Sequence, residues 1–174
     1  MNKPPFADNP ARVCAFLDAH GVPYERFDHP PAETAEDCRA LSRQFGCTIC
    51  KNLLLRTTNG SAFYLLMLPF DRRFITGEVS KRLGVSRLSF ASAEDMAALL
   101  HTGPGSMSVT SLLFDPAHRV RAALDDALLR EDFLGVHPSL NTATLKIPTP
   151  AVTQRLFPAL GVTPEVLHLD EKTV

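Results

Sequence analysis

Two apolar runs in the middle of the chain dominate its pattern of hydrophobic and polar positions. They cover residues 49–57 and 61–68, and Asn59-Gly60 lies between them. Apolar runs of this length on either side of an Asn-Gly pair are typical of a β-hairpin. Because the runs are largely apolar instead of alternating, we expect both strands to be buried on both faces.

Helix start and stop signals precede the hairpin. Asn9, followed by a proline, predicts a first helix that ends at Gly21. Thr34 is followed three residues later by an aspartate, as in a capping box, and it predicts a second helix that ends at Gly46. Two helices therefore enter the fold before its central strands.

The rest of the pattern mixes short helices and short strands. Thr76 and Ser92 are expected to cap helices that end near residues 84 and 100, and Thr149-Pro150 to begin a last helix that ends at Gly161. Short strands are expected over 24–28, 120–124, 133–136, 142–147 and 165–169. This irregular alternation favours one α+β domain over residues 1–174, with a mixed, mostly antiparallel sheet flanked by helices.

Composition and charge narrow the choice of function. Of the 174 residues, 45% are hydrophobic and 21% are charged, as in ordinary globular domains. The net charge of -1 argues against a general DNA-binding protein, so any contact with a nucleic acid has to come from a local basic patch. The tight basic pairs Arg72-Arg73 and Lys81-Arg82 are the candidates for that patch, with a solvated helix face as the alternative. The acidic pairs Asp125-Asp126 and Glu131-Asp132 are expected in solvated turns.

The distribution of apolar residues predicts where the chain resides. Residues 1–10 lack the apolar run of a signal peptide, and no run approaches the roughly 20 apolar residues of a membrane span. We therefore expect a cytoplasmic protein without a membrane anchor.

Four cysteines raise two further hypotheses. Cys47 and Cys50 form a C-x-x-C pair, which suits a redox couple or half of a zinc site. A zinc site needs a second pair of ligands, and no Cys or His pair follows at that spacing. A redox pair would begin a helix, whereas Cys50 enters an apolar strand. We expect reduced, structural thiols and neither a metal nor a cofactor.

One side chain in the first central strand suggests chemistry. Lys51 follows Cys50 and precedes Asn52 in an otherwise apolar run. A half-buried lysine is costly unless it has a partner. It therefore suits a fixed cation aimed at a phosphate or at a developing oxyanion, although a lysine that reaches solvent from the strand end is the alternative.

Two loops have the backbone and side chains of a binding site. Gly103-Pro104-Gly105-Ser106 can direct backbone N–H groups toward one point, as an oxyanion site requires, or it can be a plain turn. His137, Asn141 and Thr144 lie in or beside a loop between two predicted strands, where binding residues often occur. Neither a G-x-S-x-G nor an H-E-x-x-H motif is present, so no serine nucleophile or zinc protease site is indicated.

Taken in order, these segments resemble one family. The strand lysine, the loop Gly103-Pro104-Gly105-Ser106, and the stretch from His137 through Asn141 to Thr144 resemble the YbaK/ProX group, the free-standing homologues of the editing domain of bacterial prolyl-tRNA synthetases. The early Asp28-His29-Pro30 segment is similar as well. The Pro-Gly-Ser loop with the later His-Pro and Asn-Thr pattern is most similar to the subgroup specific for alanine.

The resemblance implies a function and a set of site residues. The substrate would be an alanyl ester on tRNA for proline, hydrolysed by water without a metal or a covalent nucleophile. Lys51, Gly103, Gly105 and Ser106 would be catalytic. An alanine-sized pocket would be lined by the strand that contains Ile49 and Asn52 and by the loop that contains His137. The partners would be the acceptor end of the tRNA and, as a further candidate, prolyl-tRNA synthetase. Cys-tRNA(Pro) or another aminoacyl-tRNA, a non-catalytic nucleic-acid-binding module and a thiol redox protein remain alternatives.

Overall fold

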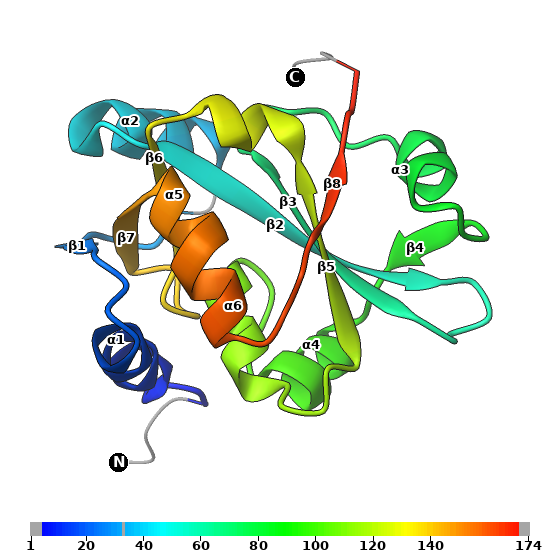
Figure 1. Ribbon diagram of the computed structural model, residues 1–174, viewed down its shortest axis with the longest axis horizontal. Coiled ribbons are helices and arrows are strands. Elements are labelled where there is room, and N and C mark those ends of the chain that lie inside the picture. Colours follow the sequence, from blue (N-terminus) through cyan, green and yellow to red (C-terminus); the bar gives the residue numbers. More distant parts are fainter. Residues whose placement is uncertain (1–4, 33, 171–174) are drawn as a thin grey trace.

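A mixed sheet forms the centre of the computed structural model, which describes residues 5–32 and 34–170 (Figure 1). Within those residues the sheet has eight strands in the order β1-β7-β6-β2-β3-β5-β8, and β4 pairs with β2 outside that path. The strands are β1 (Glu25–Asp28), β2 (Thr48–Thr57), β3 (Phe63–Pro69), β4 (Leu88–Phe90), β5 (Val120–Asp125), β6 (Phe133–Val136), β7 (Ala143–Pro148) and β8 (Glu165–Leu167).

Both kinds of strand pairing occur. Antiparallel pairing joins β1 to β7, β7 to β6, β2 to β3 and β2 to β4. Parallel pairing joins β2 to β6, β3 to β5 and β5 to β8. The expectation of a mixed, mostly antiparallel sheet flanked by helices is confirmed.

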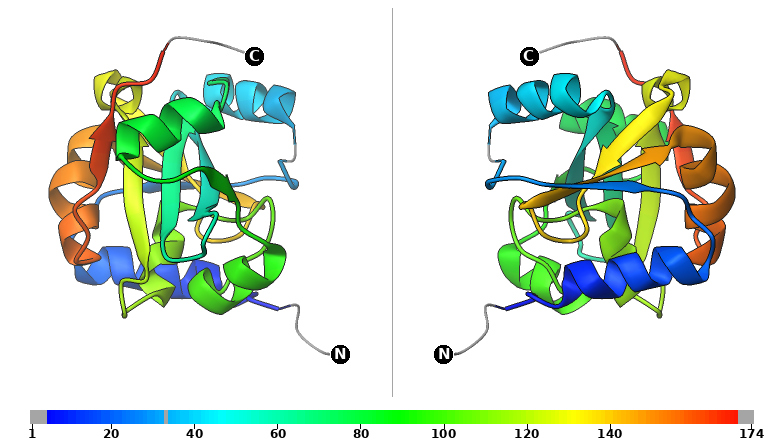
Figure 2. Two further views of the ribbon diagram at one scale, coloured as in Figure 1. Left: turned by 90° about the vertical axis from the view of Figure 1, so that its right-hand side faces the viewer. Right: turned by 90° about the vertical axis from the view of Figure 1, so that its left-hand side faces the viewer.

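Helices cover both faces of this sheet (Figure 2). The longer ones are α1 (Asn9–Ala19), α2 (Ala35–Phe45), α3 (Thr76–Leu83) and α4 (Ala93–Leu100). Shorter helical segments are η1 (Val109–Phe114), η2 (Asp126–Arg130), α5 (Thr149–Ala151), η3 (Val152–Leu156) and α6 (Phe157–Ala159). None of the described helices is long and apolar enough to cross a membrane.

Three apolar clusters hold the layers together. The largest joins one face of the sheet to α1, α4, η1 and the α5–α6 segment, through side chains such as Leu17, Leu100 and Phe157. On the other face, Val79 of α3 packs with Leu55 and Leu66 in a second cluster. A third cluster, which contains Phe45 of α2 and Ile49 of β2, covers the end of β2. As expected, β2 and β3 bury side chains on both faces.

Local signals set most element ends. Gly60 has φ of 68° in the predicted hairpin turn, a conformation that glycine adopts without strain. The Thr34 and Ser92 side chains accept hydrogen bonds from the backbone N–H groups of residues 37 and 95, which confirms both predicted caps. Thr76 is different: α3 begins at this residue, its cap position is Ile75, and no side chain caps it. The prediction that Thr76 caps the helix was wrong.

The last helix also departs from its prediction. The segment from residue 149 to 159 is interrupted by the wide turn η3, in which the Phe157 N–H donates to the Val152 carbonyl five residues earlier. Pro158 follows and has no N–H, so the regular pattern cannot continue through it. Three short elements, β4, η1 and η2, were not predicted, since each covers at most six residues.

Candidate active site

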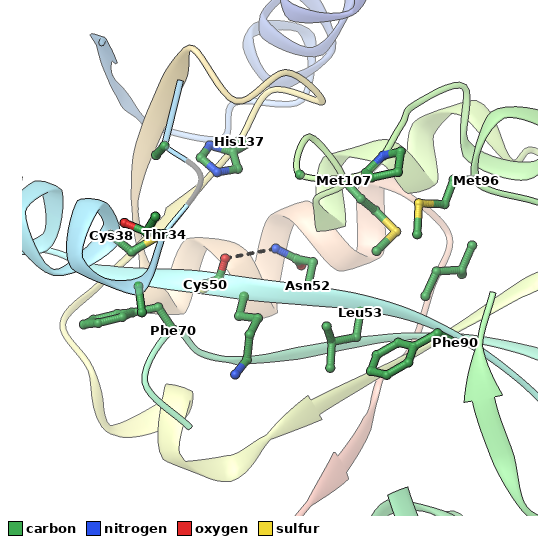
Figure 3. Close-up of a pocket in the computed structure, with 16 residues that line it drawn as sticks. Thr34, Cys38, Cys50, Asn52, Leu53, Phe70, Phe90, Met96, Met107 and His137 are labelled. Atoms are coloured by element: carbon green, nitrogen blue, oxygen red, sulfur yellow. Dashed lines mark hydrogen bonds between the residues drawn. The ribbon is translucent and has the colours of Figure 1, made fainter. Parts of the chain in front are cut away.

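A gap in the strand pairing lies beside a cavity that several of the predicted site residues line. One edge of β2 pairs with β6 at Thr48 and Ile49 and with β4 from Leu55 to Thr57. Among the described residues, the stretch 50–54 between them has no strand partner on this edge. A cavity of about 420 Å³ opens there, lined by this stretch, the start of α2, the loop 104–107, Phe90 and His137 (Figure 3).

Lys51 lies in this cavity wall. Its side chain is half-buried, and its ammonium donates a hydrogen bond to the backbone carbonyl of Arg72. Burial lowers the pKa of Lys51, while the negative charge of Asp71 opposes that shift. The predicted strand lysine is therefore a held, partly desolvated cation rather than one that reaches solvent from the strand end.

Asn52 offers an unused acceptor on the opposite face of β2. Its Nδ2 donates to the carbonyl of Cys50 at 3.1 Å, which fixes the orientation of the amide (Figure 3). Its Oδ1 is buried and has no hydrogen-bond partner among the described residues. Such a buried acceptor is costly unless a ligand satisfies it.

The glycine loop supplies fewer backbone donors than expected. Pro104 and Gly105 line the cavity, and Gly105 has φ of 79°. The Ser106 N–H already donates to the Gly103 carbonyl at 3.1 Å, and Pro104 has no N–H. The Ser106 N–H is therefore already used, and Gly103 does not line the cavity. The N–H of Gly105 is the remaining oxyanion-donor candidate within Gly103–Ser106.

His137 is a buried residue of the cavity wall, not a surface residue of a loop. Its Nδ1 lies 2.9 Å from the carbonyl of Ala143, which can only accept, so Nδ1 carries the hydrogen. Burial lowers the pKa of His137 below its ordinary 6.5, and the nearby His29 adds to that effect. In the neutral ring, Nε2 is therefore an acceptor.

The other predicted residues near His137 have supporting positions. Thr144 is fully buried, and its hydroxyl lies 2.9 Å from His29 Nε2, so it is already used within the protein. Asn141 lies beside the glycine loop, its Nδ2 being 3.7 Å from the position that a Cβ on Gly105 would take. His29 and His137 have ring centroids 6.2 Å apart. Two histidines from different loops thus lie close together, and His137 is the one that lines the cavity.

Ile49 does not line the cavity. It is buried, packs with Phe45 and Cys47, and its Cδ1 would lie 2.6 Å from a Cβ added to Gly135. Because Gly135 has no side chain, β6 can pack directly against this isoleucine. The structure does not support its predicted role in substrate binding. Ile49 lies on the same face of β2 as Lys51, but the apolar cluster with Phe45 and Cys47 buries it.

The basic residues predicted to contact the tRNA include one buried and three exposed side chains. Arg72 is buried, its Nε lies 3.0 Å from Asp125 Oδ2, and its Nη1 donates to the Asp170 carbonyl. It is therefore unavailable to a phosphate, and the expectation that Asp125 is solvated was also wrong. Arg73, Lys81 and Arg82 are exposed, and within the described part of the chain they have no ion-pair partner.

The cysteines do not form a reactive site. All four are free thiols, and Cys47 and Cys50 are buried. Burial raises the pKa of Cys47 to about 11 and raises that of Cys50 still further. Thiolate is the reactive form, so this pair lacks the lowered pKa of a redox site. The described residues also contain no group of three or more His, Cys, Asp or Glu side chains that could hold a metal.

Several cavity residues carried no signal in the sequence. Phe90, Met96 and Met107 line the cavity but are apolar residues that a core would also contain. His29 was noticed only as part of a segment similar to the family, since nothing in the sequence placed it beside Thr144. Their roles depend on long-range packing, which local patterns do not report.

Comparison with known proteins identifies the class. The family model of the aminoacyl-tRNA editing domain matches residues 29–154, more than half of the chain and most of the cavity wall. The chain belongs to this aminoacyl-tRNA editing domain family.

Individual relatives agree with that assignment. Prolyl-tRNA editing protein ProX of Acetoanaerobium sticklandii is 29% identical over 133 residues, which cover 76% of this chain and 81% of that protein. Prolyl-tRNA synthetase associated domain-containing protein 1 of Danio rerio is 29% identical over 157 residues, which cover 89% of this chain and 84% of that protein. A solved structure described as a proposed trans-editing enzyme for prolyl-tRNA synthetase has a TM-score of 0.70 at 19% identity and covers 99% of this chain and 100% of that one, which shows the shared fold.

Proposed function

We propose that this aminoacyl-tRNA deacylase removes alanine from mischarged tRNA for proline, acting in trans to the synthetase. The observation that carries the proposal is the cavity at the unpaired edge of β2, where Lys51, Asn52 and His137 line one space. Membership of the editing family supports an aminoacyl-tRNA as the substrate, and the name of the Acetoanaerobium relative supports tRNA for proline.

Strand geometry suggests how the substrate lies. Successive side chains of β2 point to opposite faces, so Asn52 lies on one face and Lys51 and Leu53 on the other. Asn52 shares its side of the cavity with His137 and Met107 (Figure 3). We place the amino acid and the adjacent ribose hydroxyl on that side. The phosphate and base of the terminal adenosine then lie on the side of Lys51, where an ammonium suits a phosphate oxygen.

The unsatisfied amide oxygen suits the amino group of the substrate. An aminoacyl ester carries an α-ammonium, which needs acceptors once it leaves water. Asn52 Oδ1 is a buried acceptor in the cavity wall without a partner among the described residues. Binding there would orient the ester carbonyl toward the edge of β2.

Hydrolysis then requires a water molecule and a stabilised oxyanion. Water attacks the ester carbonyl carbon, the bond from that carbon to the ribose oxygen breaks, and a water proton passes to the leaving ribose oxygen. We assign the Gly105 N–H, in the cavity wall, to donate to the developing oxyanion. Nε2 of neutral His137 can accept from the adjacent ribose hydroxyl, which holds it near the reacting centre.

Size accounts for selectivity. A synthetase pocket that accepts proline gains only about 1–3 kcal/mol against an amino acid that lacks one of its methylenes. A smaller second pocket can exclude proline by steric clash. The buried Met107 side chain narrows the cavity on the amino-acid side and is the residue that we assign to this exclusion.

The test is a panel of tRNA for proline charged with alanine, cysteine, serine or proline. Loss of alanine with retention of proline supports the proposal, and faster loss of cysteine would reassign the substrate. Loss of none of the four would leave a binding module. Repeating the assay with added prolyl-tRNA synthetase tests whether that enzyme is a partner.

A further inference from the structure

Phe90 exposes a large aromatic surface at the mouth of the cavity. Its side chain is 61% exposed, the highest value among the three large exposed hydrophobic residues of the described chain. The other two, Leu129 and Val166, do not line this cavity. Exposing a ring of this size costs free energy in water unless something covers it.

The ring is held in place on one side only. Phe90 packs against Phe74 with ring centroids 5.3 Å apart and planes tilted by 55°. Leu53 lies next to it in the cavity wall (Figure 3). An ordered ring with one supported side and one open side is suited to stacking a second planar group.

Its register places it on the same face as Lys51. Phe90 pairs with Leu55 across the β2–β4 ladder, and paired side chains lie on one face of a sheet. Lys51 and Leu53 alternate onto that same face as Leu55. Lys51 and Leu55 are separated by about 13 Å along the strand. The ring and the lysine therefore lie at opposite ends of the cavity that both residues line.

Exposed cations lie on the elements that pack against the ring. Arg73 is exposed and directly precedes Phe74, which the ring contacts. Lys81 and Arg82 are exposed at the end of α3, a helix that packs against β4. Within residues 5–32 and 34–170 none of these three charges has an ion-pair partner. An exposed aromatic ring with unpaired cations on neighbouring elements suits single-stranded nucleic acid.

We infer that Phe90 is the stacking platform for the terminal nucleobase of the tRNA, with the neighbouring phosphates on the side of Phe74 and Arg73. The inference rests on the proposed function, because the base then belongs to the nucleoside whose ester is hydrolysed beside Lys51. Phe90 would bind without reading sequence, since every base has a face that can stack.

A tryptophan at this position would report the stack directly. The chain contains no tryptophan, so Phe90→Trp introduces a single tryptophan, whose emission can be excited selectively over that of the two tyrosines. The probe is a minihelix with the acceptor stem of tRNA for proline, compared with the same minihelix lacking its terminal adenosine. We expect saturable quenching that depends on the terminal adenosine. Leu129→Trp, at an exposed position away from the cavity, is the matched control.

Kinetics provide the second measurement. We expect Phe90→Ala to raise KM for alanyl-tRNA about 5- to 100-fold, the range for losing one base–aromatic stack, and Phe90→Tyr to restore it. Equal quenching by both minihelices, or an unchanged KM in Phe90→Ala, would overturn the inference while the wild-type protein still hydrolyses the ester. A wild-type protein that hydrolyses nothing contradicts the proposed function instead, and the fluorescence titration still decides whether a base stacks on Phe90.

Discussion

The Arg72 guanidinium and the Asp125 carboxylate form a buried ion pair, with 3.0 Å between Nε and Oδ2. The backbone carbonyl of the same arginine accepts the hydrogen bond from the Lys51 ammonium. The pair therefore anchors the turn that orients the lysine in the cavity. A residue that the sequence suggested for tRNA contact instead supports the site from inside the protein.

Breaking this pair should destabilise the fold. Asp125→Asn leaves the buried guanidinium without a counter-charge, and we expect the free energy of unfolding to fall by about 3–5 kcal/mol. Asp126→Asn is the matched control, because its side chain is 29% exposed and its ion pair with Arg130 is a surface one, worth about 1 kcal/mol or less. Urea denaturation of both variants measures the difference. If the free energy of unfolding falls by a similar amount in the two variants, the buried ion pair contributes no more to stability than the surface pair does.

Removing the lysine should weaken hydrolysis without unfolding the chain. A hydrogen bond to a charged group contributes about 1.5–3 kcal/mol, so without the ammonium at the substrate phosphate we expect Lys51→Ala to lose about 10- to 150-fold in kcat/KM for alanyl-tRNA. Lys146→Ala is a suitable control, since Lys146 is a partly buried lysine that faces Glu25 at 3.9 Å and does not line the cavity. Single-turnover deacylation, with circular dichroism to verify folding, separates the two. Near-wild-type rates in Lys51→Ala would remove the lysine from the mechanism.

The sequence predicted the elements that local signals control. The Asn-Gly turn, the Thr34 and Ser92 caps and the apolar strands all depend on residues within a few positions of one another. The strand Leu88–Phe90 was missed because a three-residue strand is stable only through its pairing with β2. Local chemistry was thus sufficient where apolar runs or capping residues mark an element, and insufficient where an element depends on pairing with a distant strand.

The site was predictable only in part, for a related reason. Lys51 was conspicuous because a charge in an apolar strand is unusual, and the resemblance to the family added Gly105 and His137. Arg72 could not be assigned, since its partner Asp125 is 53 residues away in the sequence and 3.0 Å away in space. Phe90 could not be assigned either, because its exposure is a property of the folded surface.

His137 should make both activity and stability sensitive to acid. Its folded-state pKa is lowered below 6.5, so the folded protein favours the neutral ring. As the pH falls below about 6.5, the unfolded chain takes up this proton first, and the free energy of unfolding decreases until the folded-state pKa is reached. We expect kcat/KM to fall through that lower pKa, because the protonated ring has no acceptor at Nε2. A His137→Gln variant, measured over the same pH range, should lose this limb of the profile. An unchanged limb would assign it to another group.

The buried thiols should be dispensable for catalysis. With its pKa raised to about 11, Cys47 is almost entirely a thiol at neutral pH, and Cys50 is more so. We expect Cys47→Ala with Cys50→Ala to retain deacylation within a few-fold, and iodoacetamide to modify neither wild-type cysteine in the native protein at pH 7. Mass spectrometry of the alkylated chain locates any modification. Rapid labelling of either residue would indicate a reactive thiolate and would support the redox hypothesis instead.

Cavity size should determine which ester is hydrolysed. Met107 is buried against the cavity, and Met107→Ala removes several heavy atoms from its wall. If steric exclusion protects prolyl-tRNA, the variant should hydrolyse the prolyl ester at least about 10-fold faster than the wild type, the lower end of what one methylene contributes to discrimination. Met107→Leu keeps the volume and should keep the selectivity. The decisive quantity is the ratio of kcat/KM for alanyl and prolyl esters on the same tRNA, because a general loss of stability lowers both values together. A ratio that stays constant in Met107→Ala would place the discrimination elsewhere, whereas a ratio that falls only in the alanine variant identifies this methionine as the barrier to proline.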